Sequence, residues 1–150
     1  MKSNQSGTKK LSPASRFDIV FNCIVKRLIE NDSPSLTLQA LLNRYIGEHG
    51  IESRYELADE LGFDDRRMRR YLSGQNESPK DYRDVIKICI CLNLHPDDAK
   101  RLMIHCGHPP ESFRDDKNRA AHYAILDCPG VMTITEWNEY LMEKGYTPLD

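Results

Sequence analysis

The stretch LADELGFDDRRMRRYL, residues 57–72, carries the most structural information in this chain. Its spacing predicts a short helix, a turn at Gly62 and a second helix. An α-helix advances about 100° per residue, so Met68, Tyr71 and Leu72 fall on one apolar face of that second helix. The opposite face carries four arginines: Arg66, Arg67, Arg69 and Arg70. We therefore expect a helix that is anchored through its apolar face and presents a basic face outward.

Residues that favour helix termini mark the ends of both helices. Ser53, followed three residues later by Glu56, has the pattern of a capping box for a helix over residues 54–61. Gly62 suits a left-handed turn conformation, and Asp64 is a favoured N-cap for the basic helix. Such a pair, with a basic second helix, is what a helix-turn-helix would show if its outer face entered the major groove of DNA.

A charged outer face has a simpler interpretation, because most surface helices are charged where they meet water. Arginine is also a good helix former, so a run of arginines alone does not indicate nucleic acid. The surrounding residues favour DNA binding over that alternative. Leu57 and Leu61 supply an apolar pair, Ala58 is small enough for a close helix crossing, and Gly62 supplies the turn before the basic helix.

The rest of the chain predicts helices and no alternating strand pattern of useful length. The expected helices span about residues 17–30, 38–46, 79–92, 96–106, 117–127 and 134–144. Pro79 is expected at the first position of its helix, where the missing N–H costs nothing. A Thr133-x-x-Glu136 capping box is expected to start the last helix. The fold class is therefore all-α.

Composition limits the classes of protein to consider. The chain has 150 residues and a formal net charge of −2, so attraction to phosphate must come from local clustering of basic residues. No apolar run is long enough to cross a membrane, and the N-terminal residues lack the apolar stretch of a signal peptide. The five cysteines are odd in number and favour a reducing, cytoplasmic setting without disulfides.

Three segments are expected. Residues 1–15 are polar and predict a disordered arm. Residues 16–107 predict a helix-turn-helix domain with an added N-terminal helix over residues 17–30. Residues 108–150 predict a C-terminal helical extension.

Residues 57–107 resemble the lambda-repressor/Cro type of helix-turn-helix, often called the XRE family. The matching positions are Leu57, Ala58, Leu61, Gly62, Phe63, Met68, Tyr71, Gly74, Pro79, Ile88, Leu92, Leu94, Pro96, Ala99, Leu102 and Gly107. The predicted helix over residues 38–46 corresponds to the family's first helix. The resemblance implies a lambda-repressor-like domain with flanking helices and a transcriptional regulator that binds double-stranded DNA, as a homodimer on a two-fold symmetric site.

The resemblance also implies which residues meet DNA. Arg66 and Arg69 are expected to read bases, and Arg67 and Arg70 to contact phosphates. Two flanking phosphate contacts are expected from Arg54, which stands where the family commonly has glutamine, and from Lys80. Asp65 also departs from the pattern, because it either accepts from a cytosine amino group or repels phosphate.

Other chemistry is less well supported by the sequence. His105-Cys106-Gly107-His108 contains zinc-ligand types, but a structural zinc site needs four ligands and no second pair stands at suitable spacing. Adjacent acids such as Asp97-Asp98 lie at helix starts, where capping explains them. No motif of hydrolases, nucleotide-binding loops or zinc proteases occurs. We expect no catalysis, metal or cofactor.

Two alternatives remain open at this stage. The first is a non-catalytic protein-interaction module on the same fold, antitoxin-like or an assembly adaptor, which the acidic total charge and the aspartates beside the arginines favour. The second is RNA binding, although an exposed aromatic platform is lacking. Surplus apolar residues in the helix over residues 17–30 and around Trp137 are the sequence's indication of a homodimer.

Overall fold

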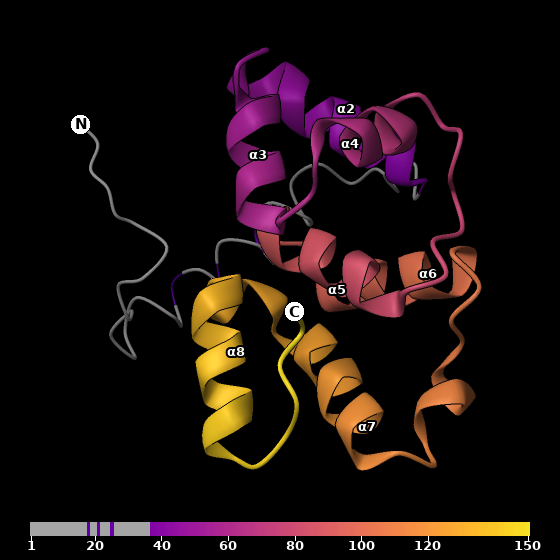
Figure 1. Cartoon of the computed structure of the whole chain (residues 1–150), viewed down its shortest axis with the longest axis vertical. Coiled ribbons are helices and arrows are strands. Elements are labelled where there is room, and N and C mark those ends of the chain that lie inside the picture. Colours follow the sequence, from indigo (N-terminus) through magenta and orange to yellow (C-terminus); the bar gives the residue numbers. More distant parts are fainter. Residues whose placement is uncertain (1–17, 19–20, 22–24, 26–36) are drawn as a thin grey trace.

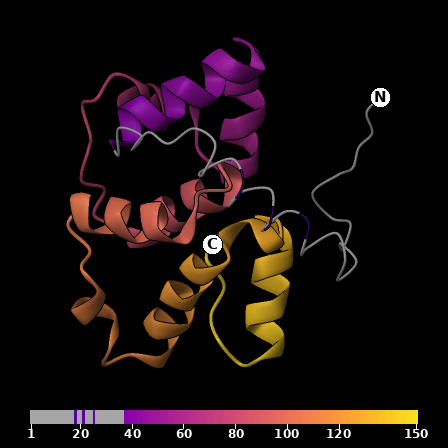
Figure 2. The same ribbon diagram turned by 180° about the vertical axis from the view of Figure 1, so that it is seen from behind.

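The computed structural model describes residues 37–150 together with Asp18, Phe21 and Val25. Residues 37–150 form seven α-helices and no β-strand, so the all-α expectation is confirmed for this part of the chain (Figures 1 and 2). The arm expected over residues 1–15 lies outside the described residues, as does most of the helix expected over residues 17–30. Its three described positions are helical. No helix in the described part is long and apolar enough to span a lipid bilayer.

The helices lie close to the expected positions. They are α2 (Leu38–His49), α3 (Ser53–Leu61), α4 (Asp65–Leu72), α5 (Tyr82–Cys91), α6 (Pro96–His105), α7 (Lys117–Ala124) and α8 (Ile134–Glu143). Three short 3₁₀ turns lie between these helices: η1 (Pro110–Phe113) between α6 and α7, and η2 (Ile125–Asp127) and η3 (Pro129–Val131) between α7 and α8. The capping box that starts α8 is confirmed, since Thr133 and Glu136 each accept a backbone N–H from the other residue.

Two expected helix starts are wrong because hydrogen bonds between neighbouring residues place the starts elsewhere. The hydroxyl of Ser53 donates to the carbonyl of Gly50 and makes no cap bond, so α3 begins at Ser53 itself, with Glu52 before it. Pro79 lies three residues before α5 rather than within it. The N-cap of α5 is Asp81, whose side chain accepts the N–H of Arg83 at 3.0 Å.

Helix α5 is the centre of the fold. Seven consecutive residues, from Asp84 to Ile90, are buried, which is the pattern of a helix surrounded by other elements. It packs against α3 and α6 and also against α7 and α8 (Figure 1). Helix α3, which precedes the arginine-bearing helix α4, and the C-terminal extension therefore pack on the same helix.

Polar side chains tie the C-terminal extension to α5. The Tyr82 hydroxyl lies 2.7 Å from Nδ1 of His122, and Nε2 of His122 lies 2.7 Å from the carbonyl oxygen of Thr147. Since a carbonyl can only accept, Nε2 carries the proton and Nδ1 accepts from the tyrosine in the neutral ring. Burial lowers the pKa of His122, which agrees with that neutral form. This chain of bonds connects α5, α7 and the segment after α8.

Two further contacts fix the same segment. The side-chain oxygen of Asn138 accepts the N–H of Leu149 at 2.7 Å. Nζ of the largely buried Lys87 lies 2.8 Å from a carboxylate oxygen of Asp150. Leu149 is almost fully buried as a result. Residues 108–150 are thus packed on the helical core.

Candidate nucleic-acid interface

The turn between α3 and α4 determines how the arginine-bearing helix is presented. Gly62 has φ 75° and ψ 26°, a left-handed conformation that side chains disfavour. The N–H of Phe63 donates to the carbonyl of Ala58 at 2.9 Å, which closes α3 as a Schellman-type end. Asp64 then caps α4 by accepting the N–H of Arg67 at 2.8 Å. The predicted turn and N-cap are confirmed.

The two faces of α4 separate as the helical spacing predicts. Met68 is fully buried and Tyr71 is 2% exposed, and α4 packs with them against α2 and α3. All four arginines of α4 are exposed. The basic face is therefore the outer surface of a well-anchored helix, and we call it the arginine face: Arg66, Arg67, Arg69 and Arg70.

Asp65 lies between two of the predicted contact residues. One carboxylate oxygen is 3.4 Å from Nη2 of Arg54, and the other is 3.0 Å from Nε of Arg69. Arg54 belongs to α3 and Arg69 to α4, so this carboxylate links the two helices. Its charge faces two guanidinium groups, which moderates the repulsion of phosphate that a bare carboxylate would exert.

Arg67 is drawn toward the interior side of α4. Its Nη1 lies 3.6 Å from the largely buried carboxylate of Asp84, and its guanidinium lies 5.0 Å from the centre of the Phe63 ring. The same carboxylate accepts the hydroxyl proton of Tyr71 at 2.9 Å. Burial, followed by the Asp84 charge, raises the pKa of Tyr71, so this hydroxyl stays a donor. Asp84 therefore holds α4 against α5.

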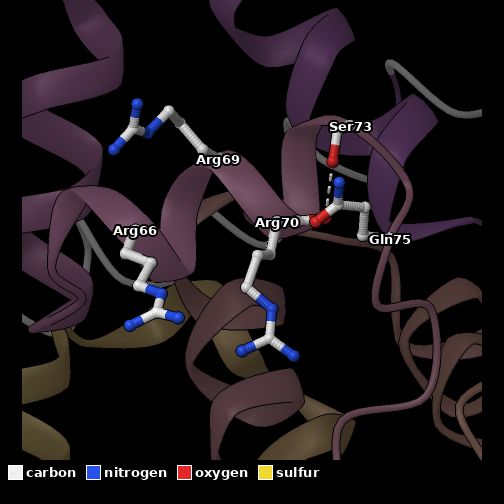
Figure 3. A pocket seen from close by; sticks show the side chains of 5 residues that line it. All are labelled: Arg66, Arg69, Arg70, Ser73 and Gln75. Atoms are coloured by element: carbon white, nitrogen blue, oxygen red, sulfur yellow. Dashed lines mark hydrogen bonds between the residues drawn. The ribbon is translucent and has the colours of Figure 1, made fainter.

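Arg66 and Arg70 differ from Arg67 and Arg69 in having no carboxylate partner among the described residues. Figure 3 shows their side chains extending to one side of α4, while Arg69 extends to the other. A shallow hollow is lined by three arginines of this face together with Ser73 and Gln75. Two free guanidinium groups at one hollow form an attractive place for an anionic group.

Lys80 joins this region from the loop between α4 and α5, residues 73–81, which we call the α4–α5 loop. A second shallow hollow lies between the loop and α4, and Arg67, Arg70 and Lys80 line it together with Asp84. Lys80 is exposed. The structure thus brings Lys80 beside two of the arginines, as the predicted flanking phosphate contact requires.

Glu77 fixes the middle of the α4–α5 loop. Its two carboxylate oxygens accept the N–H groups of Leu38 and Gln39 at 2.8 and 2.9 Å. These are the first residues of α2, where free N–H groups attract a negative charge. Nε2 of His105, in α6, lies 3.1 Å from the same carboxylate. The loop is therefore clamped between α2 and α6.

The two histidines considered as zinc ligands both contact the α4–α5 loop. His105 contacts Glu77, and Nε2 of His108 donates to the carbonyl of Pro79 at 2.6 Å. Cys106 between them is buried and free. In residues 37–150 no three His, Cys, Asp or Glu side chains come together as a metal site would need.

Sequence reasoning missed Glu77, Asp84 and the two histidines as supports of the arginine face. Glu77 meets the start of α2 from nearly forty positions away along the chain. Only Asp84 left a signal, as an acidic residue directly before the mostly apolar run VIKICIC, residues 85–91.

Comparison of the chain with protein-family models, curated proteins and solved structures finds no significant match.

Proposed function

We propose that this chain binds double-stranded DNA sequence-specifically, with α4 entering the major groove as the second helix of a lambda-repressor-like helix-turn-helix. The observation that carries the proposal is the arginine face on a helix whose turn and N-cap fix its orientation. Helix α4 has eight residues and is thus about 12 Å long. With its side chains an α-helix is about 10–12 Å across, so the major groove, which is about 12 Å wide, admits it.

The charges support distinct roles for the basic residues. Arg66 has a free guanidinium and is proposed to read a base, together with Arg69. Arg70 and Lys80 line one hollow and are proposed to contact the phosphate backbone with Arg67. Arg54 stands at the edge of α3 as a further phosphate contact. Together these residues would supply the local attraction that the net charge of −2 does not.

We also propose that the protein is a non-catalytic, cytoplasmic transcriptional regulator of the XRE type that acts as a homodimer. Half-sites read by two copies would be about 34–36 Å apart along the duplex. Trp137, named above as surplus apolar surface, is only 6% exposed and belongs to the core. Near Trp137 on α8 the exposed apolar residues are Tyr140 and Met142, and elsewhere in the described residues Ile51, Tyr55 and Ile104 are exposed as well.

A protein-interaction module remains the second candidate. The observation that favours it is the number of carboxylates beside the arginines, with Asp65 and Asp84 each touching one or two of them. Carboxylates beside the arginines lower the positive potential that attracts a polyanionic duplex, and a surface of mixed charge suits a protein partner of complementary mixed charge. A DNA-binding protein would bind duplex DNA without any other protein present, whereas a protein-interaction module would not.

Titration of a fluorescent pool of random duplexes with the full chain tests the proposal. Arg66→Ala combined with Arg69→Ala is expected to weaken binding at least about tenfold, since each base contact is worth about 1–3 kcal/mol. The matched control, Arg114→Ala with Lys117→Ala, removes two exposed charges at and just before the start of α7 and should bind normally. Helix α7 lies on the far side of α5 from α4 (Figure 1). Unchanged affinity in the first variant contradicts the proposed role of α4.

A further inference from the structure

Asp65 has both carboxylate oxygens facing arginines. Oδ1 contacts Nη2 of Arg54 at 3.4 Å, and Oδ2 contacts Nε of Arg69 at 3.0 Å. Arg54 is itself fixed, because its Nη2 donates to the Tyr55 hydroxyl at 2.8 Å and its guanidinium lies 4.6 Å from the centre of that ring. Arg69 is therefore connected through Asp65 to a restrained group on another helix.

The point of contact on Arg69 matters for what the rest of that side chain can do. A guanidinium has five N–H groups, one on Nε and four on the two terminal nitrogens. The closest approach of Asp65 is to Nε. A bidentate contact to O6 and N7 of guanine needs two N–H groups side by side, and the terminal nitrogens supply them.

We propose that Asp65 is a positioning residue for base specificity, which holds Arg69 so that its two terminal nitrogens face a guanine. This inference rests on the proposed DNA binding. It replaces the two roles expected for Asp65 from the sequence, acceptance from cytosine and repulsion of phosphate. An arginine within 3.4 Å of each oxygen occupies acceptor positions and offsets the charge, so both of those roles are weaker here than for a bare carboxylate.

The physical reason is competition for a flexible cation. An unrestrained arginine samples many rotamers, and some of them contact a phosphate, which carries no sequence information, in place of a base edge. A carboxylate one helical turn away, at i and i+4, restricts those rotamers. Specificity then increases even though the added negative charge lowers the general attraction to DNA.

The test compares the DNA motif selected from a random duplex pool by the full-length wild type and by Asp65→Asn. We expect the preference for guanine at one position of each half-site to fall about three- to tenfold, a part of what a bidentate pair supplies. Average affinity for the pool should stay equal or rise, because a negative charge has gone. Asp59→Asn is the matched control: it removes the same charge from an exposed position on α3, and should leave the motif unchanged.

Two further variants separate positioning from a structural effect. Asp65→Glu keeps a carboxylate at i and i+4 to Arg69 and should restore most of the guanine preference. In an Arg69→Ala background, Asp65→Asn should change the motif no further. Asp65 is exposed, so circular dichroism should show both single variants folded with near wild-type melting temperatures.

The outcomes distinguish this inference from the function on which it rests. A wild-type motif that Asp65→Asn leaves intact overturns the positioning role while DNA binding stands. A motif change that persists without Arg69 also overturns it. A folded wild-type chain that selects no motif overturns the proposed function, and the positioning role with it.

Discussion

The arginine face of α4 and the inner side of the C-terminal extension use polar side chains in opposite ways. On the extension, His122 and Asn138 are buried, and their hydrogen bonds hold the segment after α8 in place. On α4, Arg66 and Arg70 are exposed and meet no carboxylate in the described part of the chain. The buried side chains of the extension stabilise the fold, whereas the two arginines are left available to bind an anionic group.

The comparison teaches how to separate structural from functional polar groups. A buried polar side chain without a partner is costly, so such groups are nearly always satisfied within the protein. An exposed charge that the fold leaves unpaired stabilises little by itself. Changes in the extension should therefore lower stability, whereas changes on the arginine face should lower binding and leave stability nearly unchanged.

The largest effect is expected from Trp137→Ala. The ring is 6% exposed and its Nε1 donates to the carbonyl of Pro129 at 3.2 Å. Loss of a buried tryptophan costs about 3–5 kcal/mol of unfolding free energy. Urea denaturation followed by circular dichroism measures this. A loss below about 1 kcal/mol would mean that the extension is not part of the core.

Arg66→Ala combined with Arg70→Ala should show the reverse pattern. The unfolding free energy is expected to change by less than about 0.5 kcal/mol, since neither side chain has a partner to lose. Affinity for duplex DNA should fall by an order of magnitude or more if the proposed function holds. Denaturant titration measures the unfolding free energy, and anisotropy titration of the same sample measures the affinity for duplex DNA. A large loss of stability would contradict the claim that these two arginines contribute little to the fold.

Stability should depend on pH through His122. Burial lowers its pKa below the 6.5 of a free histidine, so the unfolded chain binds a proton that the folded one does not. The contribution of His122 is therefore complete above pH 6.5 and is lost as pH falls toward the lower folded pKa. Melting temperatures between pH 5 and 7.5 would show this, and His122→Gln should flatten that part of the profile. An unaltered profile in the variant would assign the pH dependence to other groups.

The smallest effect is expected from Lys80→Ala. Lys80 lies on the α4–α5 loop and is proposed to contact phosphate, which carries no sequence information. Affinity should fall by a similar factor for all sequences, and the slope of log affinity against log salt should decrease by about one. Loss of preference at a single base position would instead place Lys80 at a base edge.

The parts of the fold that local chemistry decides were predictable from the sequence. The division of α4 into a buried Met68 side and an exposed arginine side follows from helical spacing alone. The turn at Gly62 and the caps at Asp64 and Thr133 each depend on residues within a few positions of one another. Such features survive because tertiary contacts do not compete with them.

The parts that longer-range contacts decide were not predictable. Pro79 has the sequence features of a helix start, yet its carbonyl is bound by His108, and α5 begins at Tyr82. Glu77 gives no signal in the sequence that it caps α2. The pairing of Asp65 with Arg54 depends on how α3 and α4 cross, which spacing along one helix cannot give.

Selection of the full chain on random duplex DNA at two salt concentrations, followed by sequencing, tests the central proposal most directly. We predict an enriched palindromic motif whose half-sites are about one helical turn apart, bound more weakly as salt rises. Failure of a folded sample to bind any duplex at low salt would contradict DNA binding and favour the protein-interaction module.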